Sequence, residues 1–282
     1  MTTRHHLLGL FTVSLALQAC DSDLTFVPPD TDVFVVQAFL FSDEPVSGFT
    51  VTGVLPIDAD ATAVAEPISD AQITLIRRAI RYDLIATPAE PGRYHYPNGD
   101  LTVTVGDVFS LEVTRGQQVA TAETVVPIPP TGLELSSDSL IAPTLGGPGQ
   151  GPGGRGGGGG RGGLLNGITA SWSNSASELH FVVIDNTGTE PGILPTTELF
   201  SRFARRIVQA PTAADSSIVS IVALTHYGQH RLKLYRVNDE YADLYEGLDQ
   251  DSRDLNEPPS NIRGALGVFS AFSADSVFFE VR

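Results

Sequence analysis

The sequence contains a single cysteine, Cys20, and a single lysine, Lys233, among its 282 residues. One cysteine cannot form a disulfide bond within the chain, so a disulfide-stabilised scaffold is excluded. The 33 acidic residues outnumber the 17 lysines and arginines, and the formal net charge is −16. Nucleic acid and anionic membrane surfaces attract basic proteins, so neither is an expected partner. The low lysine content has two open explanations, adaptation to high salt and a GC-rich genome.

The sequence also lacks the short motifs of several enzyme classes. It has no H-E-x-x-H zinc motif, no G-x-S-x-G nucleophile turn and no G-K-[ST] phosphate loop. A match to the dinucleotide pattern G-x-G-x-x-G occurs only inside a glycine tract, where such a match is automatic. We therefore expect no catalytic residues and no cofactor, and we predict that the protein is not an enzyme. A hydrolase whose active site is built from remote residues is the alternative.

The N-terminal residues are typical of a secretory signal. Arg4 supplies a small basic region, and the apolar run from Leu7 to Leu17 is too short to span a bilayer. The run ends in Leu17-Gln18-Ala19-Cys20, which is similar to the lipobox of bacterial lipoproteins, where cleavage before the cysteine lets its thiol carry a lipid. The sequence therefore predicts lipidation of Cys20. An ordinary signal peptide with a chance cysteine is the alternative.

From Val33 onward the chain consists of short runs rich in valine, isoleucine, threonine and aromatic residues, separated by glycine, proline and aspartate. This pattern is typical of antiparallel strands in a β-sandwich. The predicted strands are residues 33–41, 49–55, 71–76, 81–85, 108–114, 117–125, 165–172, 179–184, 217–225, 229–235, 261–272 and 277–281.

Two short helices are predicted in the second half of the chain. One lies between Pro195 and Pro211, where apolar residues recur at helical spacing. The other begins at Asn238, which can cap it, and its apolar stripe runs from Tyr241 to Leu248 and should lie on the sheet. The single tryptophan, Trp172, ends an early strand and is expected to pack in a core rather than stack on a ligand.

A tract of glycine, proline, arginine and glutamine from Gly146 to Gly163 divides the two halves. Because it has few side chains to bury, it cannot offset the entropy lost on ordering, and a disordered linker is predicted. The predicted fold class is all-β, with two sandwich modules. The first resembles transthyretin-like or carboxypeptidase-regulatory-like sandwiches and the second resembles fibronectin type III domains. The predicted segments are a signal peptide at 1–19, a lipidated tether at 20–30, sandwiches at 31–128 and 165–282, and a Pro/Gly-rich linker at 129–164.

Two clusters resemble metal sites in part. His226 and His230 flank a predicted turn, but zinc needs three or four ligands and no third is indicated. The loop from Asp249 to Asp254 holds three carboxylates, but Arg253 interrupts it and no bidentate glutamate follows at the spacing of a calcium loop. We therefore predict surface hairpin residues and a polar loop, with no metal.

Five segments carry a resemblance to a family: Gln37-Ala38-Phe39-Leu40, Ile68-Ser69-Asp70-Ala71, Pro91-Gly92-Arg93-Tyr94, Glu240-Tyr241-Ala242-Asp243-Leu244-Tyr245 and, most clearly, Pro259 to Phe269. Together they look like the lipoproteins of the domain of unknown function 4249. In the last segment, Gly264 and Gly267 are predicted to lie where the backbone turns or approaches another part of the chain. Asn261 is predicted to satisfy backbone groups in the same turn.

The resemblance implies a cellular location and a type of partner, but no catalytic reaction. Such lipoproteins resemble the accessory lipoproteins of TonB-dependent outer-membrane transporters in their location. The family has no established activity, so the resemblance assigns no catalytic residue to this sequence. We therefore expect a non-catalytic outer-membrane lipoprotein, bound to the membrane through its lipid anchor at Cys20, that serves as a binding or assembly component of such a transporter. The alternative is an adhesin-like surface protein that binds polysaccharide or other cells.

Overall fold

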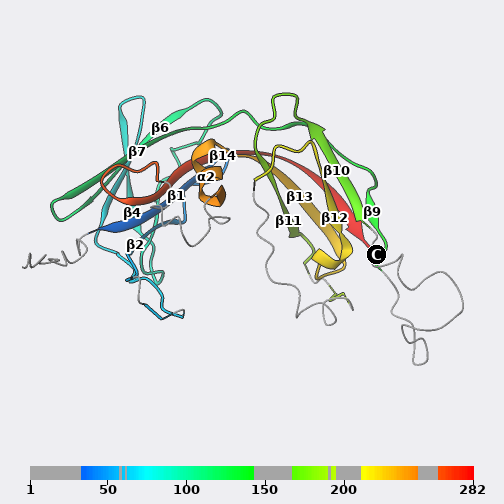
Figure 1. The fold of residues 1–282 in the computed structure, drawn as a ribbon, viewed down its shortest axis with the longest axis horizontal. Coiled ribbons are helices and arrows are strands. Elements are labelled where there is room, and N and C mark those ends of the chain that lie inside the picture. Colours follow the sequence, from blue (N-terminus) through cyan, green and yellow to red (C-terminus); the bar gives the residue numbers. More distant parts are fainter. Residues whose placement is uncertain are drawn as a thin grey trace, which may run out of the picture. The chain divides into compact units, whose positions relative to one another are not determined.

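Most of the described chain is β-strand, which confirms the predicted all-β class (Figure 1). The structure is a computed structural model and describes residues 33–56, 59–60, 62–142, 167–189, 192–194, 211–246 and 260–282. The predicted signal peptide, Cys20 with its tether, the glycine tract and the predicted helix between Pro195 and Pro211 lie outside the described residues. The same holds for the acidic loop from Asp249 to Asp254.

The first half forms seven strands around one core. Their side chains alternate between the core and the surface: in the strand that contains them, Phe109, Leu111 and Val113 are buried while the residues between them are not. The strands neighbour one another in the order β1-β2-β5-β4-β3-β6-β7. Their bounds are β1 (Phe34–Phe41), β2 (Phe49–Gly53), β3 (Gln72–Arg77), β4 (Ile80–Ala86), β5 (Arg93–His95), β6 (Val108–Arg115) and β7 (Gln118–Val125).

The second half places its core between two groups of strands. The order β12-β10-β8 forms a separate sheet, and β11-β13-β14 continues the large sheet, with β9 beside β14. Trp172 and Ile168 of β10 are buried with Leu232 of β13, so the prediction that Trp172 packs in a core is confirmed. The bounds are β8 (Thr131–Leu135), β9 (Ser139–Leu140), β10 (Gly167–Ser173), β11 (His180–Asn186), β12 (Ser216–Ser220), β13 (Gly228–Arg236) and β14 (Leu266–Val281).

The longest strand, β14, belongs to both halves. Residues 266–272 pair in parallel with β1, and residues 273–281 pair antiparallel with β13. Phe269 lies in the first core and Phe279 in the second. The sequence predicts two closing strands here because the stretch from Ser273 to Ser276 interrupts the apolar pattern. In the structure this stretch is where β14 changes partner, so a single strand of 16 residues replaces the two.

The structure also differs from the predicted linker at 129–164. Strands β8 and β9 form within it, because Leu133 and Leu140 are buried in the second core. Their apolar runs are short and lie between a proline cluster and the glycine tract. The sequence pattern therefore did not predict strands there. The predicted strand at 217–225 is shorter than expected, since β12 is followed by a short 3-10 helix, η2 (Ile221–Ala223).

One α-helix, α2 (Asp239–Glu246), is present in the described part of the chain and confirms the helix predicted after Asn238. Tyr241, the first residue of the predicted apolar stripe, packs edge-on against Phe39 of β1 and Phe272 of β14, so this part of the stripe lies on the sheet. Across the described ranges, no helix combines the length and the apolar character needed to span a bilayer.

Candidate functional site

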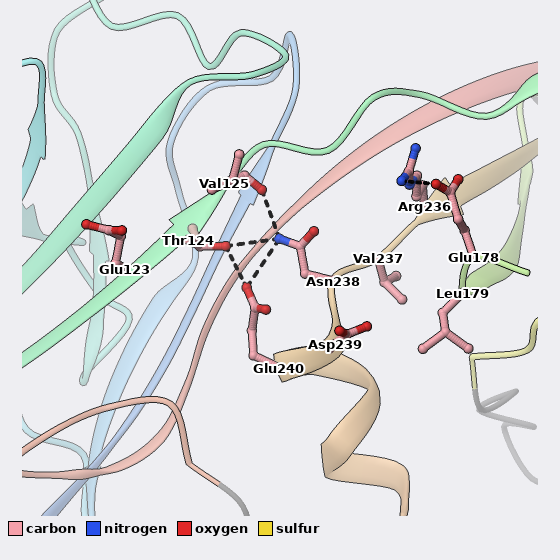
Figure 2. Close-up of a pocket in the computed structure, with 10 residues that line it drawn as sticks. All are labelled: Glu123, Thr124, Val125, Glu178, Leu179, Arg236, Val237, Asn238, Asp239 and Glu240. Carbon is pink, nitrogen blue, oxygen red and sulfur yellow. Dashed lines mark hydrogen bonds and ion pairs between the residues drawn. The ribbon is translucent and has the colours of Figure 1, made fainter. Parts of the chain in front are cut away.

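A crevice of about 430 Å³ lies where the end of β7 meets the turn from β13 into α2 (Figure 2). Three short stretches line it: residues 123–125 of β7, residues 178–179 just before β11, and residues 236–240. Its volume falls within the usual range of binding pockets, about 300–1,000 Å³. Because strands from both halves of the chain contribute, the crevice exists only in the complete fold.

Asn238 fixes one wall of the crevice to the other. Its amide nitrogen donates to the carbonyl oxygen of Val125 at 2.8 Å, the hydroxyl of Thr124 at 3.1 Å and a carboxylate oxygen of Glu240 at 3.2 Å (Figure 2). The buried Thr124 hydroxyl in turn donates to Glu240 at 2.7 Å. The side chain of Asn238 therefore joins α2 to β7, while its carbonyl oxygen accepts from the N–H groups of Tyr241 and Ala242 in the helix.

The crevice is acidic. Glu123, Glu178, Asp239 and Glu240 supply four carboxylates, and Arg236 supplies the one guanidinium. Arg236 is ion-paired with Glu178. In Figure 2, Glu123 and Asp239 have no dashed line to another of the residues drawn. Both are solvent-exposed, and neither forms an ion pair with another of the described residues, although Glu123 accepts one hydrogen bond, from the hydroxyl of Ser110 at 3.4 Å.

The two histidines considered as metal ligands have separate surroundings. The prediction of a surface hairpin residue is wrong for His230, which is buried because its ring stacks on Phe279 with centroids 5.3 Å apart and its Nε2 contacts Asn186 at 3.3 Å. Burial lowers the pKa of His230 below its ordinary value. His226 is half-buried, and its Nδ1 lies 2.7 Å from the hydroxyl of Thr225. Within the described ranges, no three histidine, cysteine, aspartate or glutamate residues are grouped as metal ligands would be.

The remaining strand histidines also have structural surroundings. His180 is buried beside Trp172, with ring centroids 5.9 Å apart, and its Nδ1 lies 2.9 Å from the carbonyl oxygen of Glu178. Burial lowers the pKa of His180. His95 contacts the hydroxyl of Thr87 at 2.9 Å. Neither histidine lines the crevice.

The segment that most clearly carries the family resemblance joins three strands. Asn261 holds both backbone groups of Phe269, donating to its carbonyl oxygen at 2.7 Å and accepting from its N–H at 2.9 Å. Gly264 and Gly267 have positive φ angles of 85° and 114°. A Cβ atom on Gly267 would lie 1.9 Å from the carbonyl oxygen of Val36. These features confirm the structural roles predicted for the two glycines. Asn261 satisfies backbone groups as predicted, but these belong to Phe269 within β14 and not to the turn itself.

Two further segments of the resemblance contact each other. The buried hydroxyl of Tyr94 donates to the carbonyl oxygen of Ile68 at 2.8 Å and accepts from the N–H of Ala71 at 3.0 Å. The N–H of Gly92 donates to the hydroxyl of Ser69 at 2.8 Å. The segments that carry the resemblance thus make contacts that hold the fold together. Of their residues, only Glu240 is among those that line the crevice.

Neither a family model nor a curated protein matches this chain. The candidate site therefore rests on the geometry of the crevice alone.

The crevice was not predicted from the sequence. Thr124 and Glu240 are 116 positions apart, and nothing in their local patterns connects them. The one local signal is Asn238, whose amide fits a helix cap equally well. Only the sheet topology, which brings the end of β7 beside the start of α2, shows that these residues act together.

Proposed function

We propose that this protein is a lipid-anchored, non-catalytic protein of the outer membrane that serves as an accessory binding or assembly component of a TonB-dependent transporter. The observation that carries the proposal is Leu17-Gln18-Ala19-Cys20 at the end of a short apolar run. A cysteine in this place is what lipoprotein processing requires, and no other cysteine occurs in the chain.

The anchor would hold the β-sheet body close to the membrane. Strand β1 begins at Phe34, and the segment between Cys20 and Phe34 spans at most about 50 Å when fully extended. A body held at that distance can contact the exposed parts of a membrane protein beside it. The anchor therefore favours a membrane-protein partner.

The family resemblance supports the transporter setting. The segments that carry it make the contacts that hold the strands in place, as Asn261 does with Phe269. A shared scaffold of this kind fits the resemblance to lipoproteins that accompany transporters. The arrangement of β12-β10-β8 beside β11-β13-β14-β9 also fits the proposed likeness of the second half to fibronectin type III domains, which commonly serve as binding modules.

The anchor is tested by replacing Cys20 with alanine. We expect the wild-type protein to sediment with membranes and to incorporate a labelled fatty acid, and the Cys20→Ala variant to incorporate none. Ser22→Ala, two positions further along, is the matched control and should behave as the wild type. A Cys20→Ala variant that still acquires the label would contradict the proposal.

The partner is tested by extracting the native protein with its lipid intact and identifying co-purified proteins by mass spectrometry. Recovery of a TonB-dependent transporter in a fixed ratio supports an accessory role. Recovery of the protein alone after mild cross-linking contradicts that role and leaves the adhesin-like alternative.

A further inference from the structure

Strand β7 lies at one end of the large sheet, and part of its free edge is unpaired among the residues that the structure describes. Thr121 exchanges two backbone hydrogen bonds with Arg263, both 2.9 Å long, and the carbonyl oxygen of Val125 accepts from the Asn238 amide. Alternate residues of an antiparallel strand direct their N–H and C=O groups to the same side. Since those of Thr121 point toward Arg263, those of Glu123 point outward as well.

The open stretch lies between these two covered positions. On its other side, β7 is paired with β6 along its whole length, with Glu123 opposite Ser110. Among the described residues, no backbone or side-chain partner meets the outward N–H and C=O of Glu123 or the outward N–H of Val125. Residues 123–125 also line the crevice, so this stretch of the edge borders it. Unpaired backbone groups of this kind form a template for one more strand.

The negative charge around this open edge determines which kind of segment the edge would bind. Glu123 and Asp239 are exposed carboxylates on opposite walls, and the one guanidinium of the crevice is already paired with Glu178. Arginine and lysine side chains form short, strong hydrogen bonds with carboxylates. Potentials of opposite sign also speed the encounter of two partners. The crevice is therefore complementary to a basic segment.

We propose that the crevice binds an extended, basic segment of a partner polypeptide, which adds as a short strand to the open edge of β7. Its backbone would pair with Glu123 and Val125, and its arginine or lysine side chains would reach Glu123 and Asp239. Strand addition of this type takes its affinity from main-chain hydrogen bonds and its specificity from side chains. The inference goes beyond the membrane anchor and does not depend on it.

The first test uses the purified full-length protein in detergent and three labelled heptapeptides, with binding followed by fluorescence anisotropy. One peptide alternates arginine and valine, the second alternates glutamate and valine, and the third is the basic peptide N-methylated along both edges. We expect the basic peptide to bind at least about tenfold more tightly than either of the others, because only it offers both charge and backbone donors. Equal binding of the N-methylated peptide would overturn strand addition.

The second test locates the binding edge with variants. Val125→Pro removes one outward N–H and no charge, at a position where an edge strand tolerates proline. We expect it to weaken binding of the basic peptide about tenfold, whereas Val125→Thr keeps the N–H and should bind as the wild type. The N-methylated peptide tests the opposite bond of the same pairing on the native protein, from a peptide N–H to the carbonyl oxygen of Glu123, so the proposal stays testable if Val125→Pro does not fold.

The third test addresses charge. We expect Glu123→Gln and Asp239→Asn each to weaken binding of the basic peptide several-fold, and more at low salt than at high salt. Glu134→Gln removes an exposed carboxylate from β8, outside the crevice, and is the matched control. Identical affinities for all three variants, or no binding of the basic peptide to the native protein, would overturn the proposal.

Discussion

At the scale of single residues, glycine sets the closest approach between strands. Gly267 has a φ of 114° and leaves room for the carbonyl oxygen of Val36, which a Cβ atom would meet at 1.9 Å. Two independent constraints, backbone conformation and contact distance, therefore exclude a side chain at this position.

We expect Gly267→Ala to lower the free energy of unfolding by about 2–4 kcal/mol, since β14 must shift away from β1 to accept the methyl group. Urea denaturation followed by circular dichroism measures this change. Gly99→Ala is the control, because Gly99 has no heavy atom within 4 Å of the added Cβ, and its effect should stay within about 0.5 kcal/mol. Equal effects of the two substitutions would contradict the close approach.

The buried histidines His180 and His230 make stability depend on pH. Burial lowers the pKa of both below the ordinary value of 6.5. As the pH falls through 6.5, the unfolded chain therefore binds protons at these positions before the folded chain does, and falling pH favours unfolding. Their contribution is fully present above pH 6.5 and is lost as the pH falls toward the folded pKa.

We expect the melting temperature of the wild type to fall between pH 7 and pH 5 more steeply than that of the double variant His180→Gln, His230→Gln. Carboxylates titrate alike in both proteins, so the comparison isolates the histidines. Parallel curves for the two proteins would contradict the assignment.

At the scale of elements, α2 is held by a polar contact as well as by its apolar stripe. Asn238 joins the start of the helix to the end of β7 through Thr124 and Val125. We expect Asn238→Ala to destabilise the fold by about 1–3 kcal/mol, because the buried Thr124 hydroxyl and the Val125 carbonyl lose a donor. Amide hydrogen exchange should quicken in α2, whereas Asn98→Ala, at an exposed turn, should leave it unchanged.

The elements show which parts of the fold the sequence could predict. Strands whose residues alternate between core and surface, such as β6 and β7, were predicted within a few residues of their bounds, and so was α2. The continuity of β14 was not predicted, because its polar middle is stabilised by pairing with β13, and pairing leaves no local signal. The crevice depends on the same long-range pairing and was missed for the same reason.

At the scale of the whole molecule, the shared strand couples the two cores. Phe269 and Phe279 belong to different cores but to the same strand, and residues 32–282 form one compact unit. We therefore expect the two halves to unfold in a single transition, although the sequence predicts two modules.

Trp172 provides a selective measurement, because it is the only tryptophan and lies in the second core. We expect Phe109→Ala, in the first core, to move the Trp172 fluorescence transition to lower urea, with a loss of about 3–5 kcal/mol. Phe278→Ala, at an exposed position of β14, should leave the transition nearly unchanged. If Phe109→Ala left the urea midpoint of the Trp172 transition unchanged, the two halves would unfold independently.

The parallel pairing of β1 with β14 also affects the order in which the fold can form during synthesis. Val35 pairs with Leu266, so the first strand cannot find its neighbour until nearly all of the intervening chain has been made. Contacts between such distant positions form slowly, because the chain must lose the entropy of closing a long loop before the contacts can stabilise it. A nascent chain of this kind should therefore stay without its complete first core until late in its synthesis.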